Sequence, residues 1–317
     1  MSKENYRRLG DYIREVDVRN RDFEVKELLG VSISKEFIPS IANTIGTDMS
    51  SYKVVEPLQF AYGPVTSRNG DKVSIALYTG KGKIIISQAY TVFEVKNQDE
   101  LLPEYLMMWF RRPEFDRYAR FKSHGSAREI FSWEEMCDVF LPIPPIEQQR
   151  KIVAEYEAVS RRIRLNEQMI ARLEETAQAL YHKMFVDGID KENLPEGWRM
   201  GAVCDFGNVI TGKTPSSDYP EDFGIDTPFI TPGDFQNYNK FAIGSERRLS
   251  TIGIDRLKNK ILTKGSVLVT CIGSDMGKVV VASEQCITNQ QINSIIVKEE
   301  FYSDYLYYCL LAMRVEL

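Results

Sequence analysis

Apolar residues recur at alternating spacings of three and four between positions 152 and 184, which is the pattern of a helix that pairs with another helix along a seam. One column of this seam is Tyr156, Ile163, Ile170, Ala177 and Met184, and the other is Ile152, Val159, Asn166, Leu173 and Leu180. A continuous helix from Ile152 to Met184 would be about 50 Å long at about 1.5 Å per residue. Prolines at 142, 144 and 145 predict its start, and Asp187-Gly188 predicts its end.

The segments on either side of this helix have the patterns of globular domains. Short β-prone runs at 52–55, 58–62, 73–78, 83–87 and 90–95 are separated by Gly, Asn and Asp turns, and a helix is predicted from Pro103. We therefore expect a first domain over residues 1–143, a long spacer helix over 144–187 and a second domain over 194–317. The predicted fold class is α+β, with two mixed α/β domains separated by a long coiled-coil helix.

The second domain repeats patterns of the first. LGDYI at 9–13 is matched by MGAVC at 200–204, SQAYTVFEV at 87–95 by NQQINSIIV at 289–297, and PEYL at 103–106 by SDYL at 303–306. These matches predict a duplication with loop insertions. Nothing after Leu317 corresponds to residues 111–145, and no second long helix follows, so the second copy is expected to be incomplete.

Composition limits the classes of function. The 317 residues carry a formal charge of −5, so binding to nucleic acid by bulk electrostatics is not expected and any DNA contact must come from local basic patches. No apolar run of about 18 residues is present, which predicts a cytoplasmic protein without a membrane partner. Five widely spaced cysteines and two histidines predict neither a metal site nor a disulfide framework, and no cofactor is expected.

Several motifs resemble those of the specificity subunits of type I restriction-modification systems. They are PPIEQQ at 144–149, LPEGW at 194–198, GKTP at 212–215 and PFITPGD at 228–234. The resemblance covers nearly the whole chain. It implies two target-recognition domains that each read half of a split DNA site, two methyltransferase subunits docked on the spacer helix, and a motor-nuclease subunit. Specificity subunits of this kind have two antiparallel helices, whereas this chain offers one, so a homodimer through the helix is expected.

Polar loops supply the candidate DNA contacts, because Arg, Lys and Asn read base edges while Ser, Thr and Lys also hold phosphates. The expected contacts are Arg68, Asn69, Lys81, Lys83, Lys122, Ser126 and Arg128 in the first domain and Lys213, Thr214, Ser216 and Lys278 in the second. Ordinary solvated loops are the alternative for each. The expected partner contacts on the helix are Ile152, Tyr156, Val159, Ile163, Asn166, Ile170, Leu173 and Leu180; Asn166 is either a register-setting amide in the seam or a simply exposed residue.

Catalysis by this chain is not expected. GNVITGKT at 207–214 matches the phosphate-binding loop, but that chemistry needs a helix directly after the threonine, and the sequence continues with PSSDYP. The (Asn/Asp)-Pro-Pro-(Tyr/Phe) motif of amino-methyltransferases is also missing from the sequence. The alternative to a DNA reader is a coiled-coil adaptor that binds proteins rather than DNA, which the acidic composition mildly favours.

Overall fold

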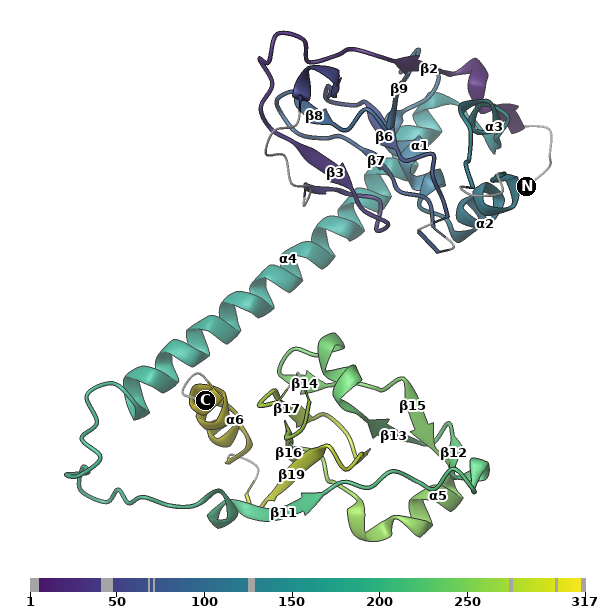
Figure 1. The fold of residues 1–317 in the computed structure, drawn as a ribbon. Helices are drawn as coiled ribbons and strands as arrows, with labels where there is room; N and C mark the ends of the chain where they lie inside the picture. The colour runs from purple at the N-terminus through teal and green to yellow at the C-terminus, as the bar shows by residue number, and fades with distance from the viewer. Residues whose placement is uncertain are drawn as a thin grey trace. The chain divides into compact units, whose positions relative to one another are not determined.

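The chain forms two compact units, Met1–Arg164 and Leu165–Leu317, which are described separately here. A computed structural model describes residues 6–40, 48–67, 69–70, 72–124, 129–273, 276–299 and 302–314 (Figure 1). One helix, α4 (Ile146–Phe185), contributes its first half to the first unit and its second half to the second. In the described residues, no helix is long and apolar enough to cross a membrane.

The first unit is built on an antiparallel sheet with the strand order β2-β9-β6-β7. Its strands are β2 (Ile13–Val16), β6 (Phe60–Tyr62), β7 (Ile75–Leu77) and β9 (Thr91–Val95). Three strand pairs surround it: β1 (Tyr6–Arg8) with β10 (Phe140–Pro142), β3 (Leu29–Val31) with β4 (Phe37–Pro39), and β5 (Lys53–Val55) with β8 (Ile84–Ile86). Each predicted β-prone run contains one strand, which confirms those predictions.

Three helices complete the core of the first unit, and the unit also contains the short 3-10 turns Leu9–Asp11 and Met49–Ser51. They are α1 (Pro103–Phe110), α2 (Pro113–Lys122) and α3 (Trp133–Cys137), and Pro103 and Pro113 each begin a helix, where the missing N–H has no cost. The rings of Phe60 and Phe93 stack with centroids 4.8 Å apart, and Phe110 packs edge-on against both. This aromatic core holds the sheet against α1 and α2.

The second unit contains two sheets. The larger has the order β11-β19-β16-β17-β14, formed by β11 (Gly207–Thr211), β14 (Phe241–Ala242), β16 (Val267–Thr270), β17 (Val279–Ala282) and β19 (Ile292–Val297). The smaller, β12-β15-β13-β18, is formed by β12 (Phe223–Gly224), β13 (Thr227–Ile230), β15 (Arg247–Leu249) and β18 (Ile287–Thr288). Its helices are α5 (Thr251–Arg256) and α6 (Tyr302–Arg314), with 3-10 turns at Val203–Asp205, Pro220–Asp222, Pro232–Asn237 and Lys258–Lys260.

The predicted duplication is visible in the sheets, because β2-β9-β6-β7 and β11-β19-β16-β17 have the same order and the same antiparallel pairing. The amide of Lys96 donates to the carbonyl of Tyr12, and that of Lys298 donates to the carbonyl of Phe206. Helices α1 and α6 follow the equivalent strands β9 and β19. One detail of the prediction is wrong: the turn before the first strand aligns Leu9 with Val203, not Met200, because Tyr12 and Phe206 bond back to those residues.

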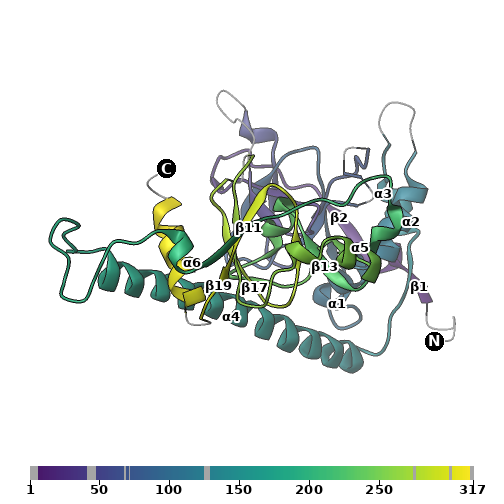
Figure 2. The ribbon, with the colours of Figure 1, turned by 90° about the horizontal axis from the view of Figure 1, so that it is seen from below.

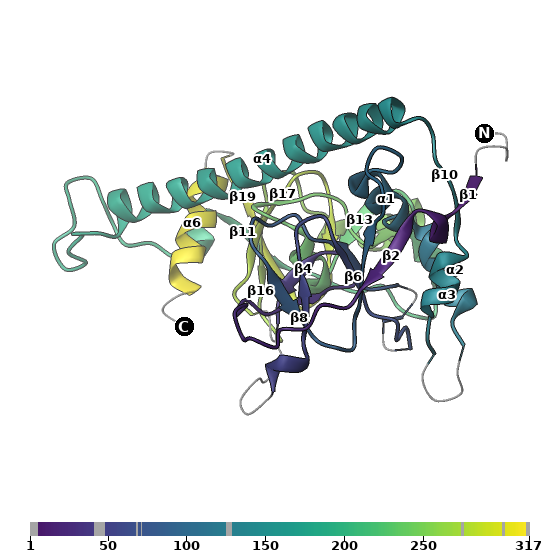
Figure 3. The ribbon, with the colours of Figure 1, turned by 90° about the horizontal axis from the view of Figure 1, so that it is seen from above.

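The spacer helix is confirmed as an unbroken helix of 40 residues (Figure 3). Near its start, the buried Gln149 side chain accepts from the Leu102 amide at 3.0 Å and donates to the carbonyls of Glu100 and Pro144 at 2.8 Å. Near its end, Tyr308 of α6 donates to Glu174 at 3.1 Å, and Tyr181 packs on Tyr305 with ring centroids 5.6 Å apart. Figure 2 shows α6 beside the last turns of α4. Each half of α4 is therefore packed against its own unit.

The predicted seam is not the side of α4 that packs against the two units, and its role as a helix-pairing face stays a prediction. The most buried apolar residues of α4 are Val153 and Tyr181, and neither belongs to the predicted columns. Tyr156, which does belong, turns its hydroxyl to Arg111 of the same unit at 3.1 Å. The packed side of the helix therefore lies beside the seam, because each unit needs its own apolar contact with α4. Most of the seam is exposed, for example Val159 at 62% and Leu173 at 63%, and Asn166 is also exposed, whereas Ile152 and Ala177 are half-buried.

Candidate nucleic-acid interface

Three segments of the first unit meet at the turn between β6 and β7. The Thr66 hydroxyl donates to the Ser123 hydroxyl at 2.9 Å, and the Thr66 amide donates to the Glu129 carbonyl at 2.9 Å. Ile130 pairs with both Val65 and His124 in isolated bridges. We call this surface, formed by residues 64–67, 69–70, 122–124 and 129–130, the first loop cluster. It brings Asn69 and Lys122 onto one surface, whereas Arg68, Ser126 and Arg128 lie outside the described residues.

The two described candidates in the first loop cluster are already engaged. Lys122 lies 3.1 Å from Glu135, and the hydrogen bond to that carboxylate raises the pKa of the lysine. The Asn69 side-chain amide points inward to the Val65 carbonyl at 3.4 Å and is half-buried. A contact between Asn69 and a base would require that bond to be exchanged. Their role in DNA contact stays a prediction.

Lys81 and Lys83 belong to a different part of the first unit. They lie between β7 and β8, and both side chains are exposed. Lys83 pairs with Glu56 at 2.7 Å, which raises the pKa of the lysine. This turn is therefore not part of the first loop cluster, although residues of both were predicted from the sequence as DNA contacts.

The second unit brings its candidates together at the corresponding edge of the repeated sheet. The Lys213 amide donates to the Thr288 carbonyl at 2.9 Å, and the Thr214 hydroxyl donates to Gln290 at 2.6 Å. Thr211 donates to Asn293 at 2.8 Å, and the Asn293 amide group reaches Cys271 at 3.3 Å. Lys278 ends the turn between β16 and β17, the counterpart of the β6–β7 turn. We call residues 211–216, 271–273, 276–278 and 289–293 the second loop cluster.

Gly212 sets the geometry of the second loop cluster. A Cβ atom at this position would overlap the carbonyl oxygens of Thr288 and Asn289, so only glycine allows the chain to approach so closely. Ser216 bonds locally to Asp218 at 3.0 Å. Residues 207–211 form a strand and residues 212–219 form no helix, so the segment lacks the helix that a phosphate-binding loop of nucleotide enzymes requires.

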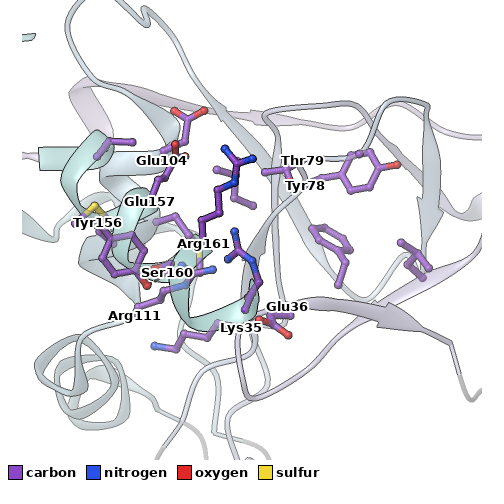
Figure 4. A pocket seen from close by; sticks show the side chains of 18 residues that line it. Lys35, Glu36, Tyr78, Thr79, Glu104, Arg111, Tyr156, Glu157, Ser160 and Arg161 are labelled. Carbon is purple, nitrogen blue, oxygen red and sulfur yellow. Dashed lines mark hydrogen bonds between the residues drawn. The ribbon is translucent and has the colours of Figure 1, made fainter. Parts of the chain in front are cut away.

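A cavity of about 680 Å³ lies in the first unit between α1, the first half of α4 and the β3–β4 turn. Figure 4 shows side chains of α1 and α4 on one side of it and those of Glu36, Tyr78 and Thr79 on the other. Arginines and glutamates line it in equal number: Arg111, Arg161 and Arg164, and Glu36, Glu104 and Glu157. Such a mixture does not favour a polyanion such as DNA.

A second cavity of about 800 Å³, also within the first unit, has a different lining. We call it the basic concavity, and its principal residues are Ile33, Lys72, Arg111, Arg117, Arg120 and Phe121. None of its four exposed cations was among the DNA contacts predicted from the sequence. The amphipathic pattern of α2, with Arg117 and Arg120 on adjacent turns, was the available signal, but Lys72 and Arg111 come from other segments and only the fold joins them.

Comparison with known proteins gives the family. The family model of the type I restriction modification DNA specificity domain matches residues 34–175 and 195–316. The specificity subunit of the type I restriction enzyme HindI from Haemophilus influenzae is 27% identical over 292 residues, which cover 70% of this chain and 63% of that subunit. The MjaIX specificity subunit from Methanocaldococcus jannaschii is 35% identical over 120 residues, 38% of this chain and 28% of that subunit. The chain thus spans less than two thirds of these relatives.

A solved structure supports the fold. The type I restriction-modification S subunit from M. genitalium superposes with a TM-score of 0.56 at 12% identity, over 98% of this chain and 78% of that one. The first match includes β6, β7 and β9 of the repeated sheet and most of α4 but begins after β2, and the second match includes the whole β11-β19-β16-β17 sheet. The chain therefore belongs to the family of type I restriction-modification DNA specificity subunits.

Proposed function

We propose that this chain is the DNA sequence-recognition subunit of a type I restriction-modification complex. The observation that carries the proposal is the repeated sheet: each copy places a polar loop cluster at the same edge, and one unbroken helix, α4, connects the two copies. Each domain, over residues 1–143 and 194–317, reads one half of a bipartite site. The helix over 144–187 sets the spacer between the halves. The chain acts in the cytoplasm, where its DNA is.

Partners supply the chemistry in this proposal. The chain itself is non-catalytic, two methyltransferase subunits dock on α4, and a motor-nuclease subunit completes the complex. The exposed seam supports a docking role for α4, because exposed apolar residues at helical spacing are typical of a face that another helix covers. The names of the HindI and MjaIX relatives as specificity subunits support the same assignment.

The exposed seam also supports a homodimer. We consider two copies of α4 that pair antiparallel, with the centre of the pairing between Asn166 and Ile170. In this register each column of one helix faces the other column of the partner helix. Ile163 then meets Leu173 of the partner, and Val159 meets Ala177. This register places the two Asn166 side chains in neighbouring layers at the centre, where each supplies the polar partner that a buried amide requires. A second copy would then provide the second antiparallel helix that the family uses.

DNA binding is tested with a gel shift on random-sequence duplex, with and without a methyltransferase subunit, over a range of salt concentrations. A DNA reader holds phosphates with cations, so the affinity should fall steeply as salt rises, with a log–log slope of about −0.9 per phosphate contact. An adaptor protein would show no such binding at any salt concentration. That result would refute the proposal.

A further inference from the structure

The basic concavity carries charge of one sign on its exposed lining. Lys72, Arg111, Arg117 and Arg120 are all exposed, and the one carboxylate in the lining, Asp116, is buried. Asp116 is already neutralised, because Lys35 lies 2.8 Å from it and the Val73 amide donates to it at 3.1 Å. The surface therefore presents four cations without a compensating carboxylate within the lining.

Carboxylates at the rim hold two of these cations only weakly. Arg117 lies 3.5 Å from Glu114, and Arg120 pairs with Glu129, but all four side chains are exposed, so each pair contributes little to stability. Within the described residues, Lys72 and Arg111 make no ion pair, and Arg111 donates only to the Tyr156 hydroxyl. An incoming anion can therefore recruit all four cations without breaking a buried interaction.

A rigid frame positions the concavity. Lys35, in the turn between β3 and β4, is 5% exposed and adopts a left-handed backbone conformation with φ of 66°. Its ammonium group pairs with Asp116 of α2, bonds to the Phe110 carbonyl at the end of α1, and lies 5.4 Å from the centroid of the Phe115 ring. One buried side chain thus fixes the β3–β4 turn against α2, which carries Arg117 and Arg120, and against the end of α1, which Arg111 directly follows.

The basic concavity adjoins the first loop cluster. The Lys72 amide donates to the Asn69 carbonyl at 3.2 Å, so Lys72 directly follows the turn of that cluster. Arg120 lies one turn before Ser123, the residue that bonds to Thr66, and its partner Glu129 belongs to the same cluster. Cations that hold phosphates beside loops that read bases are the usual division of labour in a protein–DNA interface.

We propose that the basic concavity binds the phosphodiester backbone of the duplex whose bases the first loop cluster reads. This inference rests on the proposed DNA-recognition function and names the surface that anchors the DNA. Guanidinium groups hold phosphates through paired hydrogen bonds, which suits Arg111, Arg117 and Arg120. Phe121, 80% exposed at the edge of the concavity, provides an apolar contact for a sugar. An acidic protein segment is the competing ligand, and the experiment separates the two.

The experiment compares two charge-matched triple variants of the full chain by fluorescence anisotropy with a random-sequence duplex of about 30 base pairs. The first variant, Lys72→Gln/Arg117→Gln/Arg120→Gln, removes three cations of the basic concavity. The control, Arg150→Gln/Arg162→Gln/Arg172→Gln, removes the same charge from exposed positions of α4. We expect the first variant to bind about 10- to 100-fold more weakly at about 50 mM salt, with a log–log salt slope shallower by about 2 to 3. The control should stay within about twofold of wild type.

Each outcome has one meaning, provided that circular dichroism melts of both variants match wild type. If wild type binds duplex and the concavity variant keeps its affinity and salt slope, the inference is overturned while the proposed function stands. An equal loss in the control would also overturn it, because the effect would follow net charge alone. Loss of binding to a heptaglutamate peptide, with duplex affinity unchanged, would assign the concavity to an acidic protein instead. Wild type that binds no duplex at any salt concentration would refute the proposed function itself.

Discussion

Single polar residues fix the places where the segments of this protein meet. Lys35 joins a turn to two helices, Gln149 joins α4 to the first unit, and Gly212 lets two backbone segments of the second loop cluster touch. A buried polar side chain must find all its partners to be tolerated, so such residues allow few alternative arrangements. Gln149 is the second glutamine of the PPIEQQ motif. Its burial explains why a glutamine is needed at this position of the motif.

Replacing Gln149 by leucine should destabilise the first unit by about 3 kcal/mol, because the Leu102 amide and the carbonyls of Glu100 and Pro144 lose their buried partner. Gln148→Leu, an exposed neighbour with the same chemical change, should alter stability by less than about 0.5 kcal/mol. Urea unfolding followed by circular dichroism measures both. Equal stabilities of the two variants would contradict the role assigned to Gln149.

At the scale of elements, the sequence predicted local structure well and packing less well. Periodicity located the long helix, and β-prone runs located β6, β7 and β9 of the repeated sheet in the first unit, because both signals come from neighbouring residues; β2 was not predicted. The same periodicity could not tell which face of α4 contacts the units. Val153 and Tyr181 are the most buried apolar residues of the helix, whereas most of the predicted seam is exposed, since the units cover a stripe beside it.

The exposed seam gives a prediction about self-association. Leu173→Asp should abolish dimers at tens of micromolar chain, because it places a charge opposite Ile163 of the partner helix, where burial without a counter-charge is costly. Leu165→Asp is the control: Leu165 is similarly exposed, 52% against 63%, but lies outside both seam columns. Light scattering coupled to size exclusion measures the mass of each. A wild-type chain that is strictly monomeric under these conditions would contradict the dimer.

At the scale of the whole molecule, the main feature is the repeated sheet. The two sheets share strand order, the turn that precedes the first strand and the helix that follows the last, so the chain uses one domain plan twice. The second unit adds a second sheet, β12-β15-β13-β18, without a counterpart of that order in the described part of the first unit. Two domains built alike but with different loops are what the proposed recognition of a target with two unequal halves requires.

Deleting residues 165–171 should shift the preferred spacing between the two halves of the site while both units still fold. These seven residues keep the heptad phase and leave out the contacts of Gln149 and Tyr181, which anchor α4 to the units. The helix shortens by about 10 Å, close to three base pairs at about 3.4 Å each. Sequencing of methylated adenines in a host that carries the deleted subunit, beside one that carries the parent, tests this. An unchanged spacer would refute the proposal that α4 sets it.

The sequence by itself determined the long helix, the strands β5 to β9 of the first unit, the duplication and the family resemblance, because each of these depends on spacings between near neighbours or on short motifs. Only the tertiary structure decided which cations come together. Lys83 and Lys122 lie apart, beside Glu56 and Glu135, whereas Lys72 and Arg111 join Arg117 and Arg120 in one lining around a frame held by Lys35. Cations from distant segments of the chain become neighbours only in the folded domain, and no local sequence pattern predicts which of them do.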